Sequence, residues 1–107
     1  METAAEIDNI LYQIADMLKT LPPAELQKVL LKLQDALLFE YVYNINFDGV
    51  LVQYSTAPFS QNENVKYREL LKQMIEILNK VMPNLMVMKK RRLVNYIINM
   101  LKNIALS

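Results

Sequence analysis

Few side chains are available for catalysis, because the sequence contains no cysteine and no histidine. Their absence excludes disulfides, Cys/His metal sites, a cysteine nucleophile and a histidine base. Paired carboxylates, or a serine activated by lysine, would have to do the chemistry instead. The carboxylates occur singly at polar positions of the predicted helices, and no lysine adjoins a serine. We therefore expect a protein that is not an enzyme and has no cofactor, metal or small-molecule substrate.

One cluster of charged residues could bind an anionic ligand, since Lys89, Lys90, Arg91 and Arg92 are consecutive. Such a cluster could contact nucleic-acid phosphates or act as a nuclear-import signal. Consecutive residues of a helix point to different sides, so only part of the cluster can face one surface. Tyr96 is the nearest aromatic residue for stacking on a base, and its position predicts a half-buried side chain. The alternatives are that the cluster is a solvated turn at the start of the fourth helix, or that it pairs with the acidic first half of the chain. We rank nucleic-acid binding below both.

The elements that position these residues come from a repeated pattern. Residues 10–38 return as a weaker copy at residues 74–102, 64 positions further on. Eight matched positions are apolar in both copies: Ile10 and Met74, Leu11 and Ile75, Ile14 and Leu78, Leu18 and Met82, Leu21 and Leu85, Val29 and Leu93, Leu33 and Ile97, and Leu37 and Leu101. Their three- and four-residue intervals are typical of amphipathic helices. The pattern predicts two pairs of helices, at 3–40 and 64–105.

Proline marks the joint within each pair. Pro22 and Pro23 end the first helix and suit the first turn of the second. Pro83 or Asn84 ends the third helix, and the fourth begins between residues 85 and 90. Helices joined by so short a connection should pack against each other as a helical hairpin.

Between the two pairs the apolar spacing changes to two, which is typical of β-strands. The alternating residues are Tyr43, Ile45 and Phe47 before Asp48-Gly49, and Val50, Val52 and Tyr54 after it. Asp-Gly favours a two-residue hairpin turn, because both positions take positive φ. We predict a β-hairpin at 41–56 and a loop at 57–63; the alternative is a longer second helix that runs into an irregular loop. The expected fold is mainly α (α+β), a single compact domain over 1–107 in which two helical hairpins flank the β-hairpin.

Apolar content and charge both indicate association. Apolar residues make up 53% of the 107 residues, more than such a domain readily hides in its interior. Residues 1–48 carry a net charge of −5 and residues 49–107 one of +6, so the halves can pair within one chain or between two. We predict a homodimer or a helical protein partner, bound by an apolar set on the second and fourth helices. This set is Leu30, Leu33, Leu37, Leu93, Ile97 and Leu101.

The sequence shows no signal peptide and no membrane-spanning segment. The N-terminal residues METAAEID are acidic and follow a helical pattern, unlike a signal peptide. No apolar run approaches the ~20 residues of a membrane span. The absence of cysteine suits the reducing interior of a cell. We expect an intracellular protein without membrane contact.

The first copy of the repeat also carries specific polar residues and prolines. The string is Ile10, Leu11, Ile14, Ala15, Leu18, Lys19, Leu21, Pro22 and Pro23, then Val29, Lys32, Leu33, Gln34 and Leu37. It resembles the BESS motif of insect chromatin and transcription proteins. The second copy keeps the apolar frame but lacks the Pro-Pro and Lys-Leu-Gln elements. The resemblance implies a two-helix protein-interaction module that often self-associates, in a nuclear or chromatin-associated setting.

Together these observations predict a non-enzymatic protein–protein interaction or dimerisation module, with a role in transcription regulation implied by the resemblance. A small nucleic-acid-binding protein that uses the basic second half is the first alternative. A virion or structural assembly protein is the second, because it too needs no active site.

Overall fold

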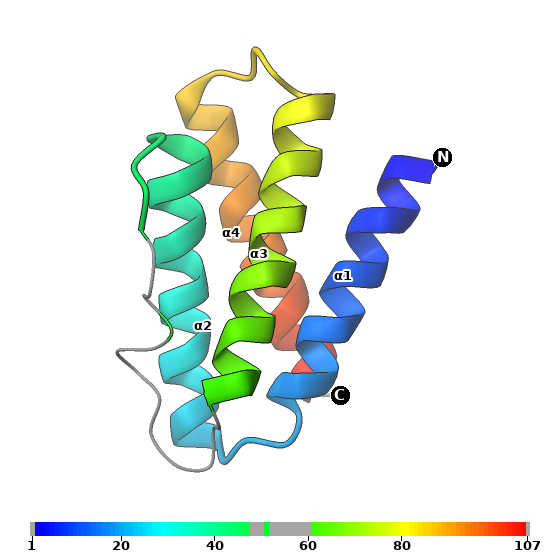
Figure 1. Ribbon diagram of the computed structural model, residues 1–107, viewed down its shortest axis with the longest axis vertical. Coiled ribbons are helices and arrows are strands. Elements are labelled where there is room, and N and C mark those ends of the chain that lie inside the picture. The colour runs from blue at the N-terminus through cyan, green and yellow to red at the C-terminus, as the bar shows by residue number, and fades with distance from the viewer. Residues whose placement is uncertain (1, 48–50, 52–60, 107) are drawn as a thin grey trace.

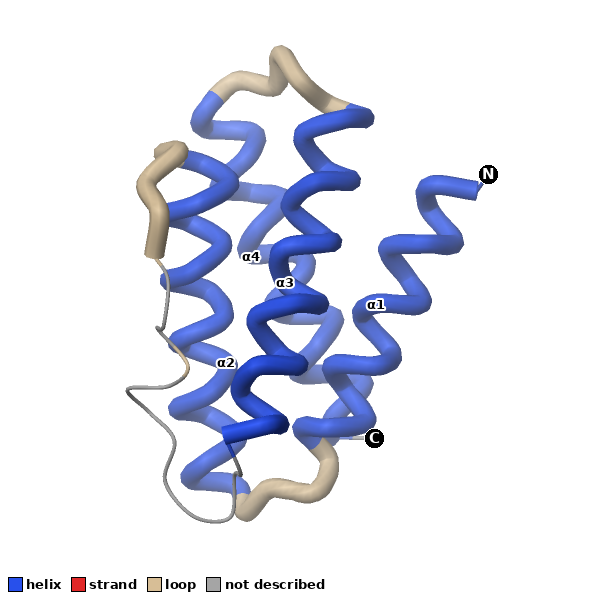
Figure 2. Tube along the Cα trace, in the orientation of Figure 1, coloured by secondary structure: helices blue, strands red, loops and turns tan. Residues whose placement is uncertain are grey.

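Four α-helices and one short π-helix make up the fold of the computed structural model (Figures 1 and 2). The structure describes residues 2–47, 51 and 61–106. The elements are α1 (Glu2–Leu18), α2 (Pro23–Leu37), the π-helix (Leu38–Val42), α3 (Gln61–Val81) and α4 (Val87–Leu106). The radius of gyration is 13.2 Å, close to the ~13 Å of a compact domain of this size. The expectation of a compact, mainly α fold is confirmed.

Helices that follow one another in the sequence lie diagonally across the bundle. α1 packs against α3 and α4, and α2 packs against α4 and α3, whereas α1 and α2 make few contacts among the described residues. In Figure 1, α1 and α2 stand at the two sides, with α3 in front and α4 behind. α1 and α4 run downward in this view, and α2 and α3 run upward. Each helix therefore has one parallel and one antiparallel neighbour.

The repeated apolar stripes meet in the core. In five of the eight matched pairs both members are buried. In the other three the second member is only half-buried; these are Met82, Leu85 and Leu93. α2 and α4 begin at Pro23 and Val87, which are also 64 positions apart. The repeat in the sequence therefore sets both the positions of the helices and the faces that they bury.

The expectation that each pair packs as a helical hairpin is wrong. Residues 19–22 join α1 to α2, and four residues can span about 13 Å. Neighbouring helix axes lie ~8–10 Å apart, so the diagonal of a four-helix bundle is roughly 11–14 Å. The joint is thus long enough to cross beneath the core, and Leu21 in its middle is buried. A short connection limits the distance between helices but does not make them neighbours.

The π-helix extends α2 by one turn and places two consecutive residues in the core. The backbone N–H of Tyr43 donates to the carbonyl of Leu38 at 3.0 Å, the five-residue spacing of a π-helix. Tyr41 and Val42 are both buried. A helix can bury two neighbours in this way, whereas a strand points them to opposite faces.

The chain then folds back over the π-helix. Asn44 takes a φ of 55°, a left-handed conformation that asparagine tolerates better than most residues. The N–H of Ile45 donates to the carbonyl of Phe39 at 2.7 Å. The N–H of Phe47 donates to a carboxylate oxygen of Glu40 at 3.1 Å, and the rings of Phe39 and Phe47 lie 4.6 Å apart. These contacts fix residues 43–47 against the end of the helix.

The prediction of a β-hairpin at residues 41–56 is therefore wrong. Residues 41–42 are helical, residues 43–47 follow the reversed path just described, and the described part of the chain contains no strand. The predicted turn and second strand, at 48–50 and 52–56, lie outside the described residues. The alternation of apolar residues was misleading: Tyr43 and Ile45 are exposed, and it is the π-helix that buries two apolar neighbours, Tyr41 and Val42.

Removal of a core side chain should cost far more than removal of the same side chain from the surface of the same helix. Leu33→Ala should lower the free energy of unfolding by about 2–5 kcal/mol, because Leu33 is 0% exposed and its loss leaves a cavity. Leu31→Ala is the matched control, since Leu31 is 60% exposed, and it should change stability by less than about 0.5 kcal/mol. Urea unfolding measures both; equal losses would contradict this packing.

Candidate functional site

The six residues predicted to bind a partner lie in the interior of this chain. Leu93 is half-buried, and the others are buried: Leu30, Leu33, Leu37, Ile97 and Leu101. They belong to α2 and α4, which pack against each other. Contact with a partner therefore has to use other side chains of the folded molecule.

The cluster of four basic residues divides at the start of α4, because Lys90 turns into the bundle. Lys90 is buried, with Nζ 3.5 Å from the carbonyl oxygen of Tyr41 and 4.9 Å from the centre of the Tyr41 ring. Its aliphatic stem packs in the core while its ammonium group donates to the end of the π-helix and lies over an aromatic face. Lys90 thus fastens α4 to the π-helix.

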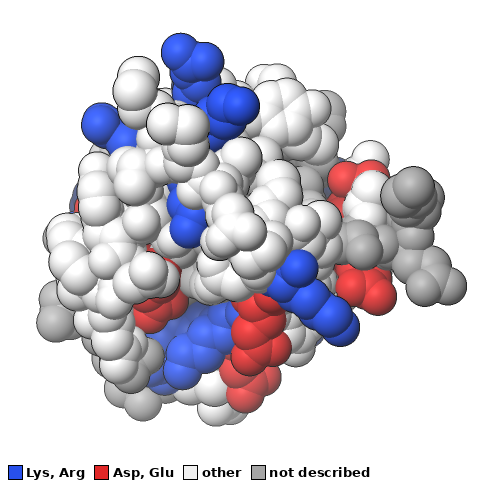
Figure 3. Space-filling view, turned by 90° about the horizontal axis from the view of Figure 1, so that it is seen from above, with Lys and Arg blue, Asp and Glu red and all other residues white. Residues whose placement is uncertain are grey.

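The other three members of the cluster, Lys89, Arg91 and Arg92, are exposed. No acidic residue follows Glu76 in the sequence, so α4 contains nothing to offset these charges. They also lie at the positive end of the α4 dipole, which adds to their potential. Figure 3 shows this end of the bundle, with basic side chains along the upper edge of the view and basic and acidic side chains mixed on the opposite side.

Exposed apolar side chains accompany these cations. Met86 and Met88 are 68% and 67% exposed, and Val81 and Val87 are exposed as well. We name this surface the cationic tip; its members are exposed Val81, Met86, Val87, Met88, Lys89, Arg91 and Arg92. Apolar groups left exposed in this way usually mark a contact with another molecule.

The sequence analysis did not identify Met86 and Met88 as binding residues. Met at helical spacing favours a place in the core, and Met74 is indeed buried. Met86 and Met88 lie instead in and beside the turn between α3 and α4, where no helix covers them. The available signal was their position directly before four basic residues in a stretch without acids.

A surface of opposite character lies between α1 and α3, and we name it the α1–α3 groove. It has a volume of about 280 Å³ and is lined by Glu6, Asn9, Ile10, Gln13, Gln73, Glu76 and Ile77. Its described lining therefore combines two carboxylates, three carboxamides and two isoleucines, without a basic residue. In Figure 1 the first turns of α1 lean away from the rest of the bundle at this groove.

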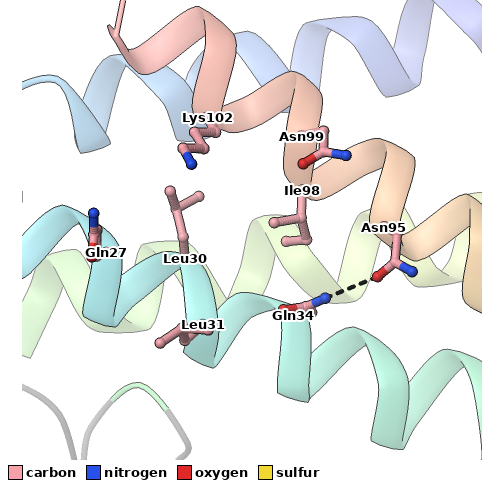
Figure 4. Close-up of a pocket in the computed structure, with 8 residues that line it drawn as sticks. All are labelled: Gln27, Leu30, Leu31, Gln34, Asn95, Ile98, Asn99 and Lys102. Atoms are coloured by element: carbon pink, nitrogen blue, oxygen red, sulfur yellow. Dashed lines mark hydrogen bonds between the residues drawn. The ribbon is translucent and has the colours of Figure 1, made fainter.

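In a larger concavity between α2 and α4, half of the eight lining residues carry amide side chains (Figure 4). It has a volume of about 480 Å³ and is lined by Gln27, Leu30, Leu31, Gln34, Asn95, Ile98, Asn99 and Lys102. The side chain of Gln34 donates to that of Asn95 at 2.9 Å and so bridges the two helices. Lys102 is the single titratable group of this lining. This concavity between α2 and α4 can form hydrogen bonds, but its described lining contains no pair of titratable groups for acid–base chemistry.

Function has to be inferred from these surfaces. In the described ranges, no group of three or more acidic, histidine or cysteine side chains is placed to hold a metal ion. None of the helices, over the residues described, has the length and apolarity needed to cross a membrane. Comparison of the chain with family models, curated proteins and solved structures finds no match.

Two buried tyrosines give the molecule a dependence on alkaline pH. Burial raises the pKa of Tyr41 above its usual value. Burial, and after it the negative charge of Glu63, raise the pKa of Tyr67. Above the ordinary tyrosine pKa of ~10 the unfolded chain loses these protons more readily than the folded chain. The stability that the two protonated tyrosines contribute is fully present below pH ~10 and is lost as the pH rises above it.

The double variant Tyr41→Phe/Tyr67→Phe should therefore lose part of this pH dependence. The free energy of unfolding of the unaltered chain should fall as the pH is raised above ~10, and the variant should show a shallower fall. Tyr12→Phe/Tyr96→Phe is the control, because both of these side chains are exposed. Urea unfolding at a series of alkaline pH values measures the slopes, and identical slopes for the three proteins would contradict the proposed cause.

Exchange of the buried lysine should affect stability, and exchange of its exposed neighbour should not. Lys90→Met keeps most of the aliphatic stem but removes the ammonium group from Tyr41, which should cost about 1 kcal/mol. Lys89→Met should stay within about 0.5 kcal/mol of the unaltered chain, because Lys89 is exposed. Thermal unfolding compares the two; the opposite order would show that the inner position of Lys90 is wrong.

Proposed function

We propose that this protein is a non-enzymatic protein-interaction module, and that the cationic tip is its binding surface. The observation that carries the proposal is the combination of exposed Met86, Val87 and Met88 with three exposed cations. Such a surface fits a partner that presents carboxylates beside apolar side chains, as an acidic amphipathic helix does. The resemblance of residues 10–38 to BESS modules supports a nuclear setting for this contact.

Apolar burial supplies most of the affinity of such a contact. Burying a methionine or valine side chain is worth roughly 1.5–3 kcal/mol, whereas a solvent-exposed ion pair is worth about 0–1 kcal/mol. The cations act mainly on the rate of encounter and on the choice of an acidic partner. Methionine adapts its shape to the surface that it meets, which suits a tip that protrudes from the fold.

Nucleic-acid binding is the second candidate, and one observation favours it. Tyr96, predicted to be half-buried, is 61% exposed and shares α4 with the exposed Arg91 and Arg92. An exposed aromatic ring near cations can stack on a base of a single strand. The exposed apolar side chains of the cationic tip favour a protein partner, since methionine and valine gain little from contact with phosphates.

A defined probe tests the proposal. A fluorescently labelled synthetic helix with leucine on one face and glutamate on the other should bind the full chain, and the same helix with lysine for glutamate should not. Met86→Ser/Met88→Ser should weaken binding about tenfold or more, because apolar area is lost from the contact. Leu31→Ser/Leu106→Ser is the control, since these exposed residues lie away from the tip.

The two candidates give different outcomes in the same experiment. If single-stranded DNA binds at physiological salt, is lost with Arg91→Gln/Arg92→Gln and is kept with the serine variant, nucleic-acid binding is the correct function. If the acidic helix does not bind, or binds the serine variant equally well, the cationic tip is not a protein-binding surface.

A further inference from the structure

The cationic tip and the α1–α3 groove are complementary in shape, charge and polarity. The tip is a protruding turn with exposed Met86 and Met88 and exposed basic side chains. The groove is concave and carries Glu6 and Glu76. We infer that the partner of the tip is a second copy of this chain, whose α1–α3 groove receives it. The inference rests on the proposed function and names the partner for the same surface.

The residues of the groove match those of the tip by type. Glu6 and Glu76 are exposed at the groove, where their carboxylates can accept hydrogen bonds from arginine. Half-buried Ile77 adds apolar surface on which methionine can pack, whereas Ile10 is almost fully covered within its own chain. The groove's three carboxamides can donate or accept hydrogen bonds with the backbone of the incoming turn. Every kind of group on the tip therefore has a matching kind in the groove.

Other pairings of the same surfaces are less favourable. Two tips facing each other would bring like charges together, and so would two grooves. Among the described lining residues of the groove, none belongs to the tip of the same chain, and the turn at the tip is hydrogen-bonded to the end of α3. The N–H of Met82 donates to Leu78 at 2.9 Å, and that of Leu85 to Met82 at 3.5 Å. A second molecule is the nearest source of a matching groove.

The two surfaces are neighbours along α3, which allows a closed dimer. Ile77 of the groove and Val81 of the tip are four residues apart, so they lie about 6 Å apart along the helix. With a two-fold axis near Val81, the tip of each copy enters the groove of the other, and every contact is made twice. Figures 1 and 3 show the start of α1 and the α3–α4 turn toward the same end of the bundle, as this arrangement requires.

Exchange of charges between the surfaces tests the inference. The groove variant Glu6→Lys/Glu76→Lys and the tip variant Arg91→Glu/Arg92→Glu each place like charges in both contacts of a dimer. In sedimentation equilibrium the unaltered protein should have twice the 12.5 kDa mass of a single chain, and each variant alone should fall to the single-chain mass. An equal mixture of the two should recover the dimer, because in the mixed pair both contacts again join opposite charges.

Matched variants keep this result specific. Glu25→Lys/Asp35→Lys on α2 and Lys28→Glu/Lys102→Glu away from the tip make the same changes in charge and should remain dimers. Circular dichroism checks that each variant is folded, and recovery in the mixture requires that both are.

The outcomes separate this inference from the proposed function. If the unaltered chain is a monomer but its tip still binds the acidic synthetic helix, the tip has another partner and the self-association is refuted. If folded groove and tip variants remain dimers, or their mixture stays monomeric, the tip-to-groove contact is refuted. Open filaments in place of dimers would refute the two-fold arrangement.

Discussion

The contact between the two helix pairs is the interaction on which the rest of the structure depends. α1 and α2 bury their apolar stripes against α3 and α4 rather than against each other. Leu33, Leu37 and Leu101, which the sequence pattern assigned to contact with a partner, are among the most deeply buried side chains of this core. Because the helix faces are occupied in this way, the surfaces left for binding lie in the grooves and at the turn between α3 and α4.

Charge follows the same division of the chain and remains visible on the surface. α1 contains four acidic and no basic residues, and α4 contains five basic and no acidic residues. Although the two helices are neighbours, their starts diverge in Figure 1, which separates the first acids of α1 from the cations of the tip. The ion pairs Lys19–Asp16, Lys28–Glu25 and Lys32–Asp35 join residues three apart on or beside one helix. Such pairs contribute little to stability, so the division of charge acts mainly on recognition.

Helix positions could be predicted from the sequence because apolar spacing reports which side of a helix is covered. The start of α4, placed between 85 and 90, is Val87. Neighbour relations could not be predicted, because a four-residue joint permits either an adjacent or a diagonal helix. The strand predicted at residues 43–47 is wrong because alternation does not distinguish a strand from a chain that turns back after a π-helix. At the tip, the inward turn of Lys90 depends on Tyr41, a contact across 49 residues that local spacing does not contain.

The diagonal order of the helices has a consequence for how the chain becomes folded during synthesis. α1 and α2 leave the ribosome first, but their apolar stripes have no nearby surface to cover, since each belongs against α3 and α4. The first half must wait as an open pair of amphipathic segments until α4, the last element, is complete. Contacts such as α1 with α4 join the two ends of the sequence, which raises contact order above that of a bundle with consecutive neighbours and slows its closure. We therefore expect that neither half folds alone and that the whole chain closes cooperatively.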